Sequence, residues 1–242
     1  MFVVVPGLLG TLLVALETWS QVFWGQPFRS QWLVSTTNCP SSTCWLVLCR
    51  LTLMKEGVVG KIVGVDISVP AIEDAKANAQ LNGFGATTLV GDKQHDNTTT
   101  TDADNGQDDM LQTTRFVAAR AEHALYRELK MQGSNRYDKV IAVVDPAREG
   151  LHADVLKSIR CHSQIDRLVY VSCNPTGSLI KDAALLCTPA SKRYRGRPFK
   201  PTFAQPVDMF PYSNHCELVM VFDRLTDTEL SEEDRQNEKK DE

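Results

Sequence analysis

The stretch RLVYVSCNPTG, residues 167–177, sets a thiol at the end of an apolar run. Its apolar and aromatic positions predict a buried strand that ends at Cys173, and Pro175 then interrupts the pattern. A cysteine thiolate is a strong nucleophile, and a neighbouring helix start can lower the pKa of a thiol. The pattern therefore indicates covalent chemistry, with a small buried hydrophobic side chain as the alternative.

Three carboxylates also stand at or near predicted strand ends. Asp66 in VGVDIS either holds the hydroxyl groups of a ribose or caps the following helix. Asp145 in VVDPAR is followed by a stiff turn that carries Arg148, which favours a binding site. Glu217 precedes the apolar run LVMVF, where burial would raise its pKa and suit it to act as a general base.

The elements that must position these four residues alternate along the chain. From about residue 60 onward, strand-like and helix-like segments follow one another, which predicts a mostly parallel sheet covered by helices. The first predicted helix has Ser68 as its cap and an apolar stripe of Ile72, Ala75 and Ala79. Ligands bind outside the carboxyl ends of the strands in such sheets, so a site is expected at that edge.

The last predicted elements lie in FAQPVDMFPYSNHCELVMVFDR, residues 203–224. Two strand-like pieces joined by the turn-like FPYSN predict an antiparallel pair. A parallel sheet closed by such a pair is common in Rossmann-like methyltransferases. The predicted fold class is therefore α/β: a Rossmann-like S-adenosylmethionine-dependent methyltransferase fold, mostly parallel with an antiparallel C-terminal strand pair.

Composition divides the chain into an ordered part and two polar segments. At 242 residues and 43% hydrophobic content, the chain can form one sizeable core. Residues 93–114 and 225–242 predict disorder, because neither segment can bury enough apolar surface to offset its ordering entropy. Residues 92–109 and 225–242 each carry a net charge of −5, and removing both from the total of −4 leaves +6. A basic folded part is compatible with binding to a polyanionic partner.

The cysteines and the N-terminus bear on compartment. Seven cysteines without a CxxC pair argue against a disulfide framework or a metal site and predict an intracellular protein of the cytoplasm or nucleus. Residues 1–50 form an atypical apolar segment that begins with sixteen uncharged residues. That run is shorter than the roughly 20 residues that span a bilayer. It also lacks the Arg residues of a mitochondrial leader, so the mitochondrion is only the alternative compartment.

Three motifs together resemble the C-terminal catalytic domain of the tRNA (uracil-5-)-methyltransferase family, in particular its animal members. VVDPAREGLH is similar to the family's Asp-Pro-Pro-Arg-x-Gly turn, and RLVYVSCNPTG to its Ser-Cys-Asn-Pro strand end. PVDMFPYSNHCELVMVFDR is similar to the family's Asp-x-Phe-Pro…His-x-Glu finish. The resemblance covers residues 51–224, which we take as the predicted catalytic domain.

The resemblance implies methylation of carbon 5 of uridine in RNA, with S-adenosyl-L-methionine as cofactor and tRNA as the substrate. Carbon 5 of uracil is a poor nucleophile, so a thiolate first attacks carbon 6 and a general base later removes the carbon 5 proton. In this chain Cys173 matches the family nucleophile and Glu217 the base. Asp145 and Asp66 match the acids expected beside the cofactor.

RNA contacts are predicted in a second place. The stretch SKRYRGRPFK, residues 191–200, combines basic and aromatic side chains suited to phosphate contacts and base stacking. The predicted RNA-binding residues are Lys192, Arg193, Tyr194, Arg195, Arg197 and Lys200. A solvated charged loop is the alternative reading of this stretch.

Two departures from the family pattern keep other functions open. Ala147 replaces the second proline of the Asp-Pro-Pro motif, and residues 38–51 contain no glycine where the family has a glycine-rich turn. Such glycines let the backbone approach a cofactor closely. One alternative is a truncated, catalytically impaired product that binds RNA or a partner. A further alternative is an RNA cytosine-5 methyltransferase, although DPAREG lacks the second Cys of that family.

Overall fold

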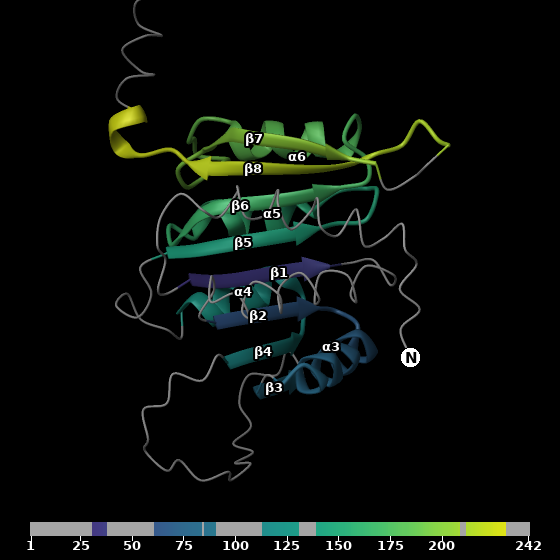
Figure 1. Cartoon of the computed structure of the whole chain (residues 1–242). Coiled ribbons are helices and arrows are strands. Elements are labelled where there is room, and N and C mark those ends of the chain that lie inside the picture. Colours follow the sequence, from purple (N-terminus) through teal and green to yellow (C-terminus); the bar gives the residue numbers. More distant parts are fainter. Residues whose placement is uncertain are drawn as a thin grey trace, which may run out of the picture.

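The structure is a computed structural model that describes residues 31–37, 61–83, 85–90, 113–130, 139–208 and 212–230. Strands and helices alternate along most of this chain (Figure 1). In chain order the elements are β1 (Gln31–Thr37), β2 (Lys61–Asp66), α3 (Val69–Leu81), β3 (Gly85–Val90), β4 (Thr113–Ala118), α4 (Ala121–Lys130), β5 (Lys139–Asp145), α5 (Ala153–Cys161), β6 (Ile165–Ser172), α6 (Ser178–Cys187), β7 (Phe199–Val207) and β8 (Glu217–Arg224).

The described strands form one sheet in the order β3-β4-β2-β1-β5-β6-β8-β7. The strands from β3 to β6 in that order run parallel, whereas β8 is antiparallel to both β6 and β7. This arrangement confirms the predicted Rossmann-like methyltransferase fold with its antiparallel C-terminal pair. The carboxyl ends of the parallel strands meet at one edge of the sheet, the right-hand edge in Figure 1.

The larger core lies between the sheet and the helices α4, α5 and α6, which pass behind the sheet in Figure 1. Strands β5 and β6 consist mainly of apolar residues because they lie inside the sheet and are buried on both faces. Tyr170 on β6 and Phe222 on β8 are fully buried in this core. These central strands therefore form a rigid base from which the loops at the carboxyl edge extend.

Helix α3 packs with a second, smaller core. Its buried residues are Ile72, Ala75 and Ala79, the stripe that the sequence predicted, and they pack with Phe116 and Ala118 of β4. The predicted cap is also present, because the hydroxyl oxygen of Ser68 accepts a hydrogen bond from the backbone N–H of Ala71 at 3.4 Å. The periodicity and the cap were sufficient to locate this helix.

Two strands were not expected. β1 lies within the predicted atypical segment 1–50 and forms an inner strand between β2 and β5, and β3 is an edge strand beside β4. The rest of residues 1–50 lies outside the described residues, as does the predicted insertion 93–114 apart from its last two residues, which begin β4. Within the described part of the chain, no helix is long and apolar enough to cross a membrane.

The predicted disordered tail 225–242 needs correction at its start. Leu225 is buried, and its backbone N–H donates to the carbonyl of Pro198 at 3.0 Å. Residues 227–230 form a helical turn, in which Leu230 N–H donates to the carbonyl of Thr226. The apolar Leu225 gives this segment buried surface that composition averaged over the whole tail concealed. Residues 231–242 lie outside the described part.

Two buried arginines lie at the amino edge of the parallel strands, opposite to the carboxyl edge. Arg224, at the end of β8, donates five hydrogen bonds of 2.7–3.0 Å to the backbone carbonyls of Ile159, Arg160, His162, Ile165 and Arg197. Arg160 donates to carbonyls at the end of α6 and to Gly196. Both guanidinium groups thus bond carbonyls that the ends of α5 and α6 leave unpaired.

Candidate active site

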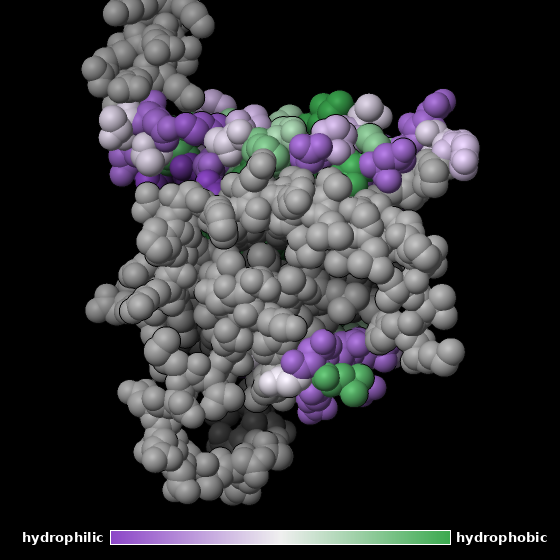
Figure 2. Space-filling model, viewed as in Figure 1, coloured by the Kyte–Doolittle hydropathy of each residue, from purple (hydrophilic) through white to green (hydrophobic). Residues whose placement is uncertain are grey.

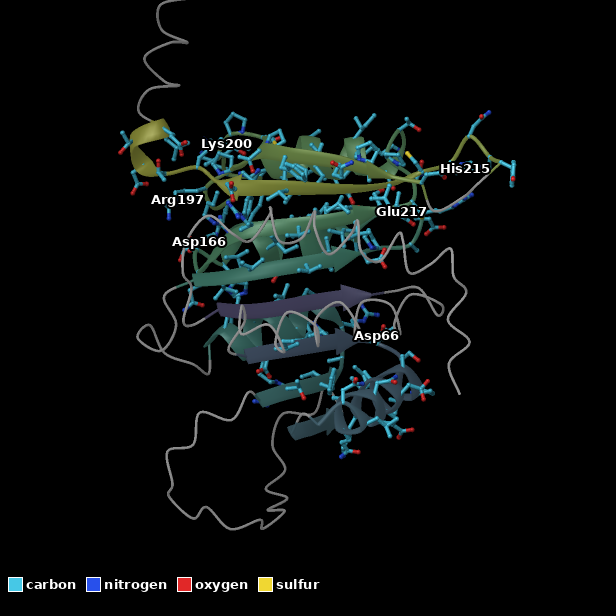
Figure 3. All side chains as sticks on the ribbon, viewed as in Figure 1. Asp66, Asp166, Arg197, Lys200, His215 and Glu217 are labelled. Atoms are coloured by element: carbon cyan, nitrogen blue, oxygen red, sulfur yellow. The ribbon has the colours of Figure 1, made fainter. Side chains whose placement is uncertain are left out.

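The four chemically interesting residues of the sequence lie at the carboxyl edge of the sheet. Asp66 ends β2, Asp145 ends β5, Cys173 follows β6 directly, and Glu217 begins β8. Figure 3 shows Asp66 and Glu217 at the same edge. Asp66 and Asp145 both pair in register with Thr37, the last residue of β1, so the two carboxylates flank the end of that strand. The fold brings together residues that are up to 151 positions apart in the chain.

Cys173 directly follows β6 and Glu217 begins the antiparallel β8, so the two residues lie at neighbouring strand ends. The β6–β8 register runs from Arg167↔Asp223 to Ser172↔Leu218. One further step of this register would set Cys173 opposite Glu217. Directly opposed residues of an antiparallel pair have Cβ atoms about 5 Å apart. A thiol and a carboxylate at this spacing can act on neighbouring atoms of one small ring.

Glu217 has the electrostatic character of a general base. Burial raises the pKa of its carboxyl to about 7, and the charge of Asp145 adds to this rise. Its Oε2 atom is buried and has no hydrogen-bond partner among the described residues. A carboxyl that titrates near neutral pH and keeps an oxygen unengaged can accept a proton from a substrate.

The thiol of Cys173 differs from the expectation based on the helix start. Burial is the main cause that raises the pKa of Cys173, and the charges of Glu217 and Asp145 raise it further. A hydrogen bond from the Arg148 side chain lowers this pKa but does not outweigh the burial. The predicted lowering by the next helix is absent because α6 begins only at Ser178, five residues later, and the desolvation dominates.

The loop after β5 supplies a functional side chain that the sequence reasoning had not assigned to the site. Arg148 is exposed, and its guanidinium lies near enough to the Cys173 thiol to lower the pKa of that thiol. Its backbone carbonyl accepts a hydrogen bond of 3.0 Å from the side-chain amide of Asn174. The conformation is a tight turn in which Gly150 N–H donates to Ala147 carbonyl at 2.8 Å. The Asp-Pro turn motif was the sequence signal that could have identified this arginine.

A cavity of about 330 Å³ opens beside Asp66 at the same edge. Its walls come from the segments that follow β2, β4 and β5, and they include Asp66, Ile67, Ala119, Arg120, Pro146, Gly150 and Leu151. One carboxylate oxygen of Asp66, Oδ1, accepts the backbone N–H of Ser68 at 2.7 Å, so Asp66 both caps a turn and lines the cavity. The volume suits a small organic ligand, since such pockets measure roughly 300–1,000 Å³.

The predicted RNA-binding residues do not join this site. Residues 191–198 lie in the connection from α6 to β7, and Lys200 lies near the start of β7. Figure 3 shows Arg197 and Lys200 at the edge of the sheet opposite to Glu217 and Asp66. Arg197 pairs with Asp227 at 3.2 Å, Lys200 pairs with Glu229, and the Arg193 guanidinium lies 5.4 Å from the centre of the Tyr194 ring. In Figure 2 this corner of the described surface is strongly hydrophilic.

Comparison with known proteins gives a family match over most of the chain. The model of the family described as tRNA (Uracil-5-)-methyltransferase matches residues 49–224. The zebrafish (Danio rerio) tRNA (uracil-5-)-methyltransferase homolog B is 36% identical over 167 residues, which cover 68% of this chain and 28% of the relative. The human homolog A is 29% identical over 214 residues, which cover 88% of this chain and 27% of the relative. The chain thus spans less than a third of these proteins.

Solved structures are similar at a lower level. TrmK of M. capricolum in complex with S-adenosyl-homocysteine has a TM-score of 0.46 at 8% identity, covering 86% of this chain and 67% of that one. The N-methyltransferase NodS of Bradyrhizobium japonicum has a TM-score of 0.47 at 9% identity, with coverages of 89% and 98%.

Proposed function

Because the chain belongs to the tRNA (uracil-5-)-methyltransferase family, we propose that it transfers a methyl group from S-adenosyl-L-methionine to carbon 5 of a uridine in RNA. We propose tRNA as the RNA and a covalent bond between Cys173 and carbon 6 of the uracil as the intermediate. The observation that carries the proposal is a thiol directly after β6 beside a carboxyl at the start of β8, close enough for the Glu217 charge to raise the pKa of Cys173, while the pKa of Glu217 is itself raised to about 7.

The two side chains suit the two steps of this chemistry. The thiolate of Cys173 adds to carbon 6, and the electron pair of the 5,6 double bond makes carbon 5 nucleophilic. After carbon 5 has gained the methyl group, the carboxylate of Glu217 removes its remaining proton. The double bond then re-forms, the bond between carbon 6 and sulfur breaks, and the thiolate leaves.

The mutual influence of the two groups supports this order of events. The charge of Glu217 raises the pKa of Cys173, so thiolate and carboxylate disfavour one another in the resting site. Arg148 opposes this effect at the sulfur. In the adduct the sulfur is an uncharged thioether, so this repulsion of the Glu217 carboxylate ends when that carboxylate is needed as a base.

The cavity fits the cofactor that this chemistry needs. When bound, S-adenosyl-L-methionine supplies an electrophilic methyl group. We propose that Asp66 holds its ribose hydroxyls, as acids at this position do in Rossmann-like sites. The remaining walls are largely apolar, as expected for an adenosine-sized ligand. We propose that Asp145 lies between cofactor and target base, since its charge reaches both Glu217 and Cys173.

The basic loop 191–200 enters this proposal as a remote contact for the RNA backbone. Strand β8 has eight residues, so its two ends are roughly 26 Å apart. We propose that Lys192 and Arg195, for which no ion pair is found among the described residues, contact phosphates while a uridine occupies the site.

Methyl transfer to an RNA transcript tests the proposal directly. The chain is incubated with S-adenosyl-L-methionine and unmodified tRNA, and the digested nucleosides are identified by mass spectrometry. We expect 5-methyluridine from the unaltered chain and none from Cys173→Ala. Cys161→Ala is the matched control, because this thiol is exposed and lies at the opposite end of the fold. Formation of 5-methylcytidine instead would support the cytosine-5 alternative.

A second candidate function is RNA binding without methyl transfer. β1 ends at Thr37 between Asp66 and Asp145, and the thirteen residues that follow include no glycine. Calorimetric titration with S-adenosyl-L-methionine separates the two functions. Micromolar binding would support the enzyme, whereas no detectable binding together with retained RNA binding would support the second candidate.

A further inference from the structure

A buried carboxyl lies beneath the loop after β5 and has no part in the proposed chemistry. Asp182 of α6 is 5% exposed, and its Oδ2 atom accepts two hydrogen bonds. The backbone N–H of Leu151 donates one at 2.7 Å, and the hydroxyl of Tyr170 donates the other at 2.6 Å. Tyr170 is completely buried on β6, three residues before Cys173. The carboxyl therefore ties the loop to the core.

Gly150 shows how closely the loop approaches this carboxyl. A Cβ atom at Gly150 would lie 2.7 Å from Asp182 Oδ2 and 2.9 Å from the Cβ of Ser178. The φ angle of Gly150 is +89°, a conformation that other residues rarely adopt. Only glycine lets the backbone turn at this point and bring the N–H of Leu151 onto Asp182.

The loop is fastened at two points, the backbone of Arg148 itself and that of Leu151 three residues later. Asn174 holds the carbonyl of Arg148 at 3.0 Å, and Asp182 holds the N–H of Leu151. Arg148 is exposed and has a long side chain, so its guanidinium stays at the Cys173 thiol only if its backbone is fixed. The same loop forms part of the cavity wall through Pro146, Gly150 and Leu151.

We infer that Asp182 is a positioning residue that fixes the loop after β5 and so holds the Arg148 guanidinium against the nucleophilic thiol. This role rests on the proposed function, because that function assigns Cys173 as the nucleophile. Asp182 does not touch the reacting atoms. It acts through Leu151 and Arg148, and the hydrogen bond from the Tyr170 hydroxyl orients its carboxylate.

The direction of one measurement separates positioning from a direct charge effect. A negative charge near a thiol raises the pKa of that thiol, so removing Asp182 would lower the pKa of Cys173 if charge alone mattered. If Asp182 positions Arg148, removing it releases the guanidinium, and the pKa of Cys173 rises instead. The groups that face this thiol are Arg148 from the loop, Glu217 from β8 and Asp145 from β5.

The test measures how fast iodoacetamide alkylates Cys173 as a function of pH, with the Cys173 peptide followed by mass spectrometry. For Asp182→Ala we expect the profile to move to higher pH and the rate at pH 8 to fall about three- to tenfold, since only the thiolate reacts. Asp182→Asn keeps an acceptor oxygen and should stay near the unaltered profile. The exposed Cys161 is the internal control, and its rate should not change in either variant.

If Asp182→Ala does not fold, Gly150→Ala applies the same test from the loop, because the added Cβ must displace the turn from Asp182. An unchanged Cys173 profile, or a shift to lower pH, in a folded variant would overturn the inference even if its melting temperature fell. The alkylation profile needs neither cofactor nor RNA. A chain that makes no 5-methyluridine but still shows the shift would refute the proposed function and leave the positioning role standing.

Discussion

Strand β8 carries a charged side chain at each end, the half-buried Glu217 and the buried Arg224, and the two charges differ in how far hydrogen bonds satisfy them. Arg224 at the amino edge of the parallel strands bonds five backbone carbonyls and stacks over Phe199 with 4.3 Å between guanidinium and ring centre. Glu217 at the carboxyl edge leaves a buried oxygen without a partner among the described residues. Figure 3 shows that the candidate site residues Asp66 and Glu217 lie at the second edge.

The difference indicates which end serves stability and which serves chemistry. Burial lowers the pKa of Arg224 to about 10, so at pH 7 it remains a cation whose hydrogen bonds are satisfied. Burial raises the pKa of Glu217 to about 7, so at the same pH its proton is easily gained and lost. Satisfied buried charges hold a fold together, and under-satisfied ones cluster at functional sites.

The largest effect is expected from the nucleophile at the carboxyl edge. Replacing Cys173 by alanine removes the atom that we propose bonds carbon 6, so 5-methyluridine formation should fall on the order of 10³-fold or more. The free energy of unfolding should change little, because this half-buried thiol has few bonds to lose. Radiolabelled methyl transfer and urea denaturation measure the two quantities. Substantial activity in this variant would contradict the covalent mechanism.

The base at the same edge should give a smaller loss with a distinctive product. Glu217→Gln keeps the shape but cannot take the carbon 5 proton, so turnover should fall about 10²- to 10⁴-fold. Because elimination then fails after methylation, RNA should remain bonded to Cys173. A denaturing gel would reveal this complex as a slowly migrating band. The double variant with Cys173→Ala should lose the band, and its persistence would point to another attachment site.

Arg224 should show the reverse pattern. Replacing it by methionine removes a donor from five carbonyls, of which that of His162 keeps the N–H of Ile165. Each buried group left unsatisfied costs about 1–3 kcal/mol, so we expect a loss of several kcal/mol in unfolding free energy. Arg197→Met is the matched control at the same edge, because its ion pair with the exposed Asp227 should contribute less than about 1 kcal/mol. Similar losses in the two variants would remove the contrast between buried and surface arginines.

Sequence patterns located most elements and predicted the candidate site residues, but they could not predict which groups these charges bond. The period of Ile72, Ala75 and Ala79 fixed α3, and the apolar runs fixed β5 and β6, because burial of a helix face or an inner strand leaves a local pattern. The partners of Arg224 lie 27 to 65 positions away along the chain. They are backbone carbonyls, which leave no trace in residue types.

Pairings between side chains at the site were hidden for a related reason. The sequence identified Cys173 and Glu217 by resemblance, but the burial that raises the pKa of the thiol depends on how the loops pack over it. The anchoring of Leu151 by Asp182 joins residues 31 positions apart. β1 escaped prediction because QWLVSTT is short and polar in part, and its place between β2 and β5 follows from topology.

A moderate effect is expected on the pH dependence of the unfolding free energy, and it depends on Glu217. Its pKa in the folded chain, about 7, exceeds the usual value of 4.5, so the folded state binds more protons than the unfolded state between these values. Stability from this group is therefore complete below pH 4.5 and is lost as the pH rises through 7. After allowance for solvent screening we expect a loss of about 1–2 kcal/mol.

Glu217→Gln should lack this loss, so the variant should be more stable than the unaltered chain above pH 7 and similar to it near pH 4.5. Thermal unfolding at several pH values measures the difference. An equal pH dependence in both proteins would show that Glu217 is not the under-satisfied charge. Methyl transfer by the unaltered chain should meanwhile rise through about pH 7, as the carboxylate form becomes available.

The smallest effect is expected from the surface at the amino edge, where the charged side chains are exposed. Asp227 and Glu229 pair with Arg197 and Lys200 of the basic loop, and exposed pairs of this kind contribute little to folding. The double variant Asp227→Asn, Glu229→Gln should therefore unfold with nearly unchanged free energy.

If RNA phosphates contact this loop, removing two nearby negative charges should tighten RNA binding a few-fold at low salt, and the gain should shrink as salt rises. Filter binding at two salt concentrations measures it. Unchanged affinity at both would favour a merely solvated loop and confine RNA recognition to the carboxyl edge, where Glu217 lies.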